Sequence, residues 1–274
     1  MNTISKSPQS HEDFFLPLTS TKQPLQMKKV AHFLSYPFSI LFYLSFGFIL
    51  VVFHAIQWIC FNVFGYQAHK KSVDYLNLGI LACLKILGTS FQFKVPKSIP
   101  KNVPLIIISN HQSLWDIPPI IWFLRKVHPK FISKKELGKG IPSVSYNLRH
   151  GGSILIDRKN VRQALTEMIT FSNYLKKHNR SGVIFPEGTR SRTGKPKKFH
   201  RKGLQTLFAK LPEAYVLPIT INNSWKLQRH GMFPMPLGVK IKYDLHPVIQ
   251  VSEYEIEELI DKVETIITSK IIAE

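Results

Sequence analysis

Residues 105 to 119 read Leu-Ile-Ile-Ile-Ser-Asn-His-Gln-Ser-Leu-Trp-Asp-Ile-Pro-Pro, an apolar run followed by a polar turn and two prolines. A short, almost wholly apolar run predicts a strand that is buried on both faces. Proline is tolerated in the first turn of a helix. The segment therefore predicts a strand, a loop and the start of a helix, and its loop carries His111 and Asp116.

The same alternation of strands and helices continues along the chain. Strands are expected at 91–95, 105–109, 131–133, 153–157, 182–186, 215–222 and 239–245. Helices are expected at 117–127, 161–178, 203–211 and 253–272. Strands that alternate with helices of this length predict an α/β fold with a layered, mostly parallel sheet flanked by helices.

A long uncharged segment precedes this domain, because residues 30–69 contain no Asp, Glu, Lys or Arg. A helix that crosses a membrane needs about 20 apolar residues, so one straight helix of this length would be about twice too long. Lysines flank both ends, as is typical of cytoplasmic borders. We expect a hydrophobic helical hairpin in the membrane, bent near Gly47 or at His54, and a buried hairpin of a soluble protein is the alternative.

These patterns divide the chain into three parts. Residues 1–29 are polar and are expected to be a disordered lead-in. Residues 30–69 are expected to be embedded in the membrane, and residues 70–274 to form the α/β domain. The basic flanks place the expected location at the cytoplasmic face of a membrane, which in a bacterium is the inner membrane.

The chain is strongly basic, with 37 Lys and Arg against 17 Asp and Glu and a net charge of +20. Such an excess favours anionic partners, namely nucleic acid, anionic membrane lipids or phosphorylated metabolites. Charge alone does not choose among them. The two cysteines, Cys60 and Cys83, have no ligand-type spacing, so neither a metal site nor a disulfide framework is expected.

Polar groups follow three of the expected strands. His111 follows the strand at 105–109, Arg158 the strand at 153–157, and the turn 187–190 the strand at 182–186. Because parallel strands end at the same edge of a sheet, these groups are expected to converge there.

His111 with Asp116 five positions later is the minimum equipment for deprotonating a hydroxyl. The imidazole titrates near neutral pH, and a carboxylate can fix its tautomer and stabilise its charged form. The plainer alternative makes Asp116 a helix cap and His111 a loop residue. Ser113 lies between them and suggests a serine nucleophile, but the glycines expected around such a serine are missing.

The turn Glu187-Gly188-Thr189-Arg190 has the composition of an anion clamp. Arg190 can donate two parallel hydrogen bonds to a phosphate, Gly188 permits close backbone approach, and Thr189 adds a hydroxyl donor. Glu187 is expected either to orient Arg190 or to accept a hydroxyl proton. Arg190 also belongs to a run of ten Lys and Arg between residues 176 and 202, which is expected to form a basic rim.

Four blocks of sequence together resemble the motifs of the glycerolipid acyltransferases, the family of bacterial 1-acyl-sn-glycerol-3-phosphate (lysophosphatidate) acyltransferases. They read Asn-His-Gln-Ser-Leu-Trp-Asp at 110–116, Gly-Ser-Ile-Leu-Ile-Asp-Arg at 152–158, Phe-Pro-Glu-Gly-Thr-Arg-Ser at 185–191 and Val-Leu-Pro-Ile at 216–219. One departure is that Ile154 and Leu155 stand where the family often has an aromatic residue.

The resemblance implies an O-acyltransferase that moves a fatty acyl group from acyl-CoA or acyl-carrier protein to the sn-2 hydroxyl of lysophosphatidate, giving phosphatidate. It implies His111 and Asp116 as catalytic residues, Arg158 as a second phosphate ligand, and neither a cofactor nor a metal. Anionic membrane lipids are expected partners and nucleic acid is not. Another lysophospholipid or a lyso-aminolipid as acceptor is the alternative within the family. A basic membrane- or nucleic-acid-binding protein without catalysis is the alternative of another class.

Overall fold

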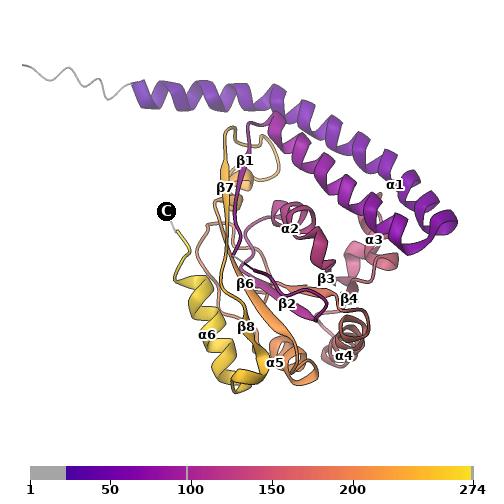
Figure 1. The fold of residues 1–274 in the computed structure, drawn as a ribbon. Helices are drawn as coiled ribbons and strands as arrows, with labels where there is room; N and C mark the ends of the chain where they lie inside the picture. The colour runs from indigo at the N-terminus through magenta and orange to yellow at the C-terminus, as the bar shows by residue number, and fades with distance from the viewer. Residues whose placement is uncertain (1–22, 97, 273–274) are drawn as a thin grey trace, which may run out of the picture.

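The computed structural model describes residues 23–96 and 98–272, with side chains from Lys29 onward. Most of the expected lead-in at 1–29 therefore lies outside the described residues. The chain forms a sheet between two layers of helices (Figure 1). The helices are α1 (Gln23–Ile86), α2 (Ile117–Phe123), α3 (Val144–His150), α4 (Val161–His178), α5 (Arg201–Lys210) and α6 (Ile256–Thr268).

The sheet has eight strands and is mostly parallel, which confirms the predicted fold class. Its strands are β1 (Ser90–Lys94), β2 (Leu105–Ser109), β3 (Pro129–Lys134), β4 (Ile154–Ile156), β5 (Ser181–Ile184), β6 (Tyr215–Asn222), β7 (Lys240–Leu245) and β8 (Ile249–Gln250). Their order is β1-β7-β6-β2-β5-β3-β4, and β8 pairs with β6. The strands from β6 to β4 are parallel, and β7 and β8 run antiparallel to β6.

Alternate residues of the central strands build the two halves of the core. On β2, Leu105 and Ile107 pack with α1 and α2, whereas Ile106 and Ile108 pack with α4, α5 and α6. All four side chains are almost fully buried. Figure 1 shows α1 and α2 on one side of the sheet and α4 to α6 on the other. A strand covered on both faces is apolar at almost every position, which explains the apolar run Leu-Ile-Ile-Ile at 105–108.

The N-terminal helix is a hairpin, but its bend is at Gly65 and not at Gly47 or His54. Gly65 has φ 77° and ψ −171°, a conformation open to glycine and strained for other residues. The second arm continues to Ile86, and buried residues such as Leu76 and Leu84 pack into the core. Residue 70, where the α/β domain is expected to begin, lies within α1 just after this bend.

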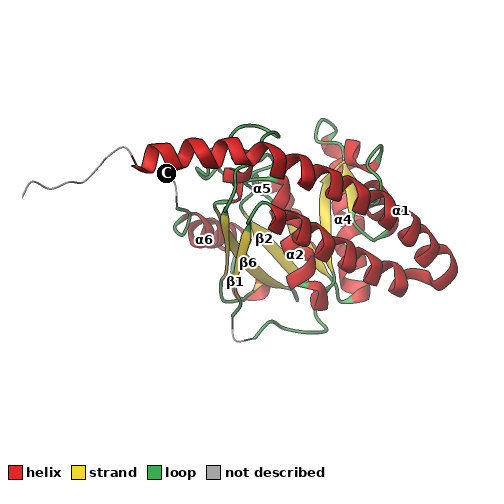
Figure 2. Cartoon of the chain, turned by 90° about the horizontal axis from the view of Figure 1, so that it is seen from above, coloured by secondary structure: helices red, strands yellow, loops and turns green. Residues whose placement is uncertain are grey.

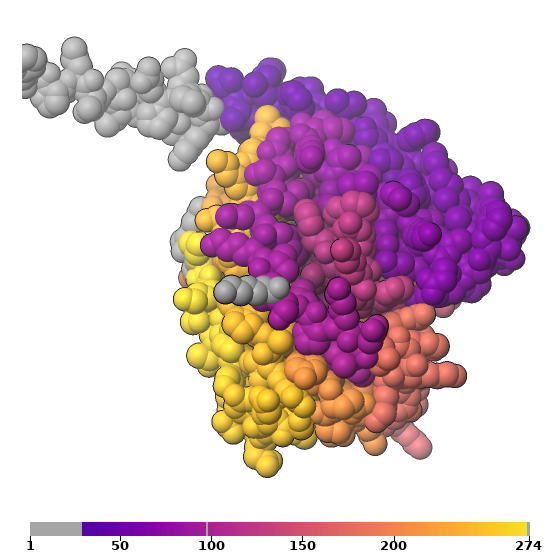
Figure 3. Space-filling view, in the orientation of Figure 1, coloured from indigo at the N-terminus to yellow at the C-terminus, as the bar shows by residue number. Residues whose placement is uncertain are grey.

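The first arm of α1 lies along the domain and presents an apolar surface away from it. Figure 2, seen from above, shows the two arms side by side across one face of the sheet, and Figure 3 shows α1 covering the upper right of the molecule. Large side chains such as Phe33, Leu44, Phe48 and Phe64 are each 68–76% exposed. Among the described residues, one helix has the length and apolar composition to cross a membrane, namely α1 between Lys29 and Ile86.

Candidate functional site

The carboxyl ends of neighbouring parallel strands bring the polar groups together, as strand direction predicts. His111 follows β2, Glu187 follows β5 and Ser224 follows β6. Backbone hydrogen bonds join the first two loops: the Glu187 carboxylate accepts from the His111 amide at 3.3 Å, and the Ser191 amide donates to the His111 carbonyl at 2.7 Å. The loop after β2, which carries His111, and the loop after β5, which carries Glu187 to Arg190, are therefore held together.

His111 and Asp116 are in direct contact. The distance between His111 Nδ1 and Asp116 Oδ2 is 2.8 Å, and the His111 ring stacks on Phe185 with 4.2 Å between ring centroids. Since a carboxylate only accepts hydrogen bonds, this contact places the ring proton on Nδ1. Nε2 makes no hydrogen bond to any described residue and is left as the basic nitrogen. The His111 side chain is 16% exposed, so the ring can be reached from outside.

The Asp116 carboxylate is fully buried and its orientation is fixed by several donors. Oδ2 also accepts from the backbone amides of Gln112 at 2.7 Å and Ser113 at 2.9 Å, while Oδ1 accepts from the hydroxyls of Ser113 and Ser224. The Ser113 hydroxyl in turn accepts from the Trp115 amide. Asp116 is thus the partner of the base and also closes the capping box of the turn 114–116, whose N-cap is Ser113. Its side chain makes no capping hydrogen bond to α2, so the alternative role as a side-chain cap of that helix is not seen.

Ser113 is fully buried in this network. A nucleophile must reach its substrate, and the Ser113 hydroxyl is instead held by the turn that it caps. The geometry therefore favours direct attack by a substrate hydroxyl over a serine acyl-enzyme.

Glu187 is 3% exposed, and burial raises its pKa to about 8. The His111 amide and Lys197 act in the opposite direction but do not offset the loss of solvation. Glu187 Oε2 has no hydrogen-bond partner in the described structure. No hydrogen bond between Glu187 and Arg190 is present in the described chain, so the expected orienting role is not seen. A protonated Glu187 can instead donate a hydrogen bond.

Arg190 and its neighbours form a compact turn. Gly188 has φ 69°, and a side chain there would approach the His200 ring to 3.0 Å. Lys197 Nζ donates to Thr189 Oγ1 at 2.9 Å and to the Arg190 carbonyl at 3.0 Å. Burial, and secondarily the nearby Arg192, lowers the pKa of Arg190. Positive charge is therefore concentrated at this turn.

Arg158 reaches the same turn from β4, where its guanidinium donates to the Gly188 carbonyl. The neighbouring Asp157 carboxylate accepts from the Lys159 amide at 2.9 Å. The structure thus brings together all seven residues expected at the site, with Arg158 at its exposed rim.

Three residues of this site are not predicted by the sequence. Asn110 holds the loop that carries His111 to β6, because its Nδ2 donates to the Ile221 carbonyl at 2.8 Å and its Oδ1 accepts from the Ile221 amide at 2.7 Å. Ser224 contacts Asp116, and Gln228 Oε1 accepts from the Leu114 amide at 3.4 Å. The positions of Ser224 and Gln228 could have been predicted, because both follow the strand expected at 215–222 and parallel strands end at a common edge of the sheet.

The fourth block of sequence lies in the centre of the sheet. Val216, Leu217 and Ile219 of β6 are fully buried and contribute to the core. Pro218 is accommodated because β6 pairs with β8 only at Tyr215 and Val216 and with β7 only from Ile219 onward. Its missing N–H therefore falls between two antiparallel ladders.

Comparisons with known proteins agree with this geometry. A family model described as Acyltransferase matches residues 90–222. A 1-acyl-sn-glycerol-3-phosphate acyltransferase from Borreliella burgdorferi is 31% identical over 185 residues, covering 65% of this chain and 72% of that protein. One from Helicobacter pylori is 34% identical over 125 residues, covering 44% and 50%. The crystal structure of the 1-acyl-sn-glycerophosphate (LPA) acyltransferase PlsC from Thermotoga maritima superposes with a TM-score of 0.72 at 25% identity, covering 89% and 95%. The chain therefore belongs to the family of 1-acyl-sn-glycerol-3-phosphate acyltransferases.

Proposed function

We propose that this protein transfers a fatty acyl group from acyl-CoA or acyl-carrier protein to the sn-2 hydroxyl of 1-acyl-sn-glycerol-3-phosphate, giving phosphatidate. The observation that carries the proposal is the 2.8 Å contact between His111 Nδ1 and Asp116 Oδ2, with Nε2 free beside a basic turn. The relatives' names supply the class of reaction, and the arrangement of side chains supplies the roles.

His111 acts as the general base in this mechanism. Nε2 takes the proton of the acceptor hydroxyl while the hydroxyl oxygen forms a bond to the thioester carbonyl carbon. The tetrahedral intermediate then expels the thiolate, and the imidazolium returns the proton to sulfur. Asp116 stabilises the imidazolium through the Nδ1 hydrogen bond and is not itself protonated.

The phosphate of the acceptor is held by Arg190, with Arg158 and the Thr189 hydroxyl at its edge. A guanidinium matches two phosphate oxygens at once, which fixes the acceptor's orientation as well as its affinity. Glu187, neutral at pH 7 because of its raised pKa, places no negative charge beside the phosphate. An ionised carboxylate at this position would repel the phosphate instead.

The first arm of α1 attaches the enzyme to the membrane and also supports the site. Phe42 and Phe46 pack edge-on against Trp115, the neighbour of Asp116, with 5.2 and 5.4 Å between ring centroids. The opposite side of this arm is apolar and exposed, so it is proposed to enter the lipid at the cytoplasmic face. Deletion of residues 1–70 would therefore remove core packing as well as membrane binding.

The decisive test is acyl transfer from labelled acyl-CoA to 1-acyl-sn-glycerol-3-phosphate by the full chain in phospholipid vesicles. Loss of the general base in His111→Ala should reduce kcat by about 100- to 10,000-fold. His150→Ala, which alters an exposed histidine at the end of α3, is the matched control and should retain activity. Equal turnover by the two variants would refute His111 as the base.

Two further measurements separate the alternatives. Rapid mixing with labelled acyl donor and no acceptor should leave the protein unacylated, whereas a stoichiometric acyl-protein would support a serine nucleophile at Ser113. A comparison of lysophosphatidate with other lysophospholipids and lyso-aminolipids identifies the acceptor. A basic binding protein without catalysis would show no transfer to any of them.

A further inference from the structure

A second basic cavity lies at the opposite edge of the sheet from His111. Its lining residues lie just before β2, β3 and β5, whereas His111 and Glu187 lie just after β2 and β5. The cavity has a volume of about 340 Å³. Five cationic or titratable side chains line it, namely Lys101, Lys126, His128, His178 and Arg180. It is therefore distinct from the turn that carries Arg190.

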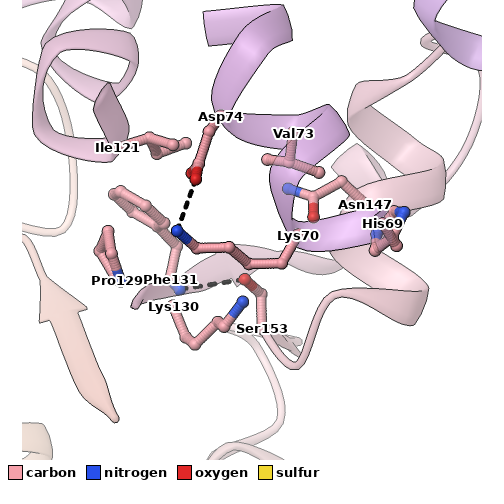
Figure 4. Close-up of a pocket in the computed structure, with 10 residues that line it drawn as sticks. All are labelled: His69, Lys70, Val73, Asp74, Ile121, Pro129, Lys130, Phe131, Asn147 and Ser153. Atoms are coloured by element: carbon pink, nitrogen blue, oxygen red, sulfur yellow. Dashed lines mark hydrogen bonds and ion pairs between the residues drawn. The ribbon is translucent and has the colours of Figure 1, made fainter. Parts of the chain in front are cut away.

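No acidic side chain lies among the described residues that line this cavity. Asp74 lines a separate small cavity of about 20 Å³ that is drawn in Figure 4. Figure 4 shows Asp74 already paired with Lys70, and the same carboxylate also acts on the neighbouring Lys130. The described lining of the larger cavity thus carries positive charge and no carboxylate of its own to balance it.

Tyr66 joins the two cavities to the bend of α1. The guanidinium carbon of Arg180 lies over the Tyr66 ring, 4.1 Å from its centroid. The Lys130 ammonium lies 5.2 Å from the same centroid. Tyr66 follows Gly65 directly, and Gln67 lines the larger cavity. A ligand in this cavity would therefore touch both the edge of the sheet and the bend of the hairpin.

The cationic groups affect one another. Burial first, and then repulsion by Lys70, Lys130 and Arg180, lowers the pKa of His128 to about 4. Burial, then Arg180 and Lys70, lowers the pKa of Lys130 to about 7. Cations crowded in this way gain from a bound anion, because it offsets repulsion that the protein leaves uncompensated.

We infer that this cavity binds the phosphate group of a second ligand, independently of the Arg190 turn. A doubly charged phosphate suits several converging cations, and the guanidinium of Arg180 offers paired donors. The volume lies at the lower end of the range for small-molecule sites, about 300–1,000 Å³. Two sources supply this chemistry: the headgroup of an anionic phospholipid at the hairpin bend, or a soluble phosphate ester.

The test uses the full chain carrying Arg190→Gln, so that the turn near His111 contributes little to phosphate binding. In one arm, calorimetric titration measures the affinity for inorganic phosphate. In the other, flotation measures binding to phosphatidylcholine vesicles with and without phosphatidate. The test variant is Lys101→Gln with Lys126→Gln, both exposed at the cavity. The control, Lys210→Gln with Lys240→Gln, removes the same charge from exposed positions elsewhere.

The test pair should weaken binding by about tenfold relative to the control pair, as expected for the loss of two charged contacts. Loss confined to inorganic phosphate supports a soluble phosphate ester as the ligand. Loss of the phosphatidate-dependent part of vesicle binding, with or without loss of phosphate binding, supports a lipid headgroup. Equal behaviour of the two pairs in both arms overturns the inference.

Discussion

Ser224 donates a hydrogen bond from its hydroxyl to Asp116 Oδ1, although the two residues are 108 positions apart in the chain. Ser224 lies at the end of β6, and its amide also donates to Gln112 Oε1 at 3.1 Å. The Asp116 carboxylate is therefore held from two sides, by its own turn and by the neighbouring strand. Ser224 acts as a positioning residue, because it reaches the base only through Asp116.

Replacement of Ser224 by Ala should lower kcat by roughly tenfold with little change in KM for either substrate. The hydroxyl bonds a buried carboxylate, and a hydrogen bond to a charged group contributes about 1.5–3 kcal/mol. Steady-state kinetics with varied acceptor separate kcat from KM. Ser224→Thr retains the hydroxyl and should restore most of the rate. A KM effect without a kcat effect, or failure of Thr to rescue a folded protein, would contradict the positioning role.

Glu187 should make the stability of the protein depend on pH between about 4.5 and 8. Its folded-state pKa is about 8 against an ordinary value of 4.5, so the folded chain keeps a proton that the unfolded chain loses. This contribution to stability is complete below pH 4.5 and is lost as the pH rises towards 8. Chemical denaturation at several pH values measures the unfolding free energy of wild type and Glu187→Gln. Between pH 4.5 and 8, the unfolding free energy of wild type should fall relative to that of the variant by on the order of a few kcal/mol.

The amide of Gln cannot ionise, so the stability of Glu187→Gln should be flatter over this range. The matched control is Glu253→Gln, at an exposed position in the turn 251–253. Parallel pH curves for wild type and Glu187→Gln would show that Glu187 is ionised at neutral pH and cannot act as a donor.

Arg190→Lys should raise KM for lysophosphatidate by about tenfold or more, because an ammonium cannot make two parallel bonds to a phosphate. Arg158→Lys should have a smaller effect. Arg158 is exposed, and its guanidinium already donates to the Gly188 carbonyl. Initial rates over a range of acceptor concentrations measure both variants. A larger effect from Arg158 would make it the principal phosphate ligand and demote Arg190.

The sequence predicted best those features that depend on local pattern. The helix at 161–178 and the strands at 105–109 and 215–222 have the expected bounds, because periodicity and breakers there agree. The common edge of the sheet placed His111 near residues 187–190. Helix α3 was missed because its seven residues, 144–150, form too short a pattern, and β8 has only two.

Other features depended on contacts between distant segments. The bend at Gly65 is one, because the run 30–69 is uncharged throughout and gives no periodic signal for where it turns. The contact of Ser224 with Asp116 is another, since the serine alone carries no sign of its partner. The raised pKa of Glu187 is a third, because desolvation arises from the whole fold around it.

The two sides of the first α1 arm should respond differently to substitution. Leu44 and Phe48 are 68% and 69% exposed and have little core to lose, whereas Phe42 is fully buried against Trp115. Leu44→Gln with Phe48→Gln should therefore abolish most vesicle binding with little change in unfolding free energy. Phe42→Ala should instead destabilise the fold by about 3–5 kcal/mol and lower activity, since it leaves a cavity beside the turn that holds Asp116. Vesicle flotation and denaturation of both variants measure the two effects. Strong destabilisation by the Leu44 and Phe48 changes would mean that this side is covered by protein, and the apolar surface would then not be a membrane contact.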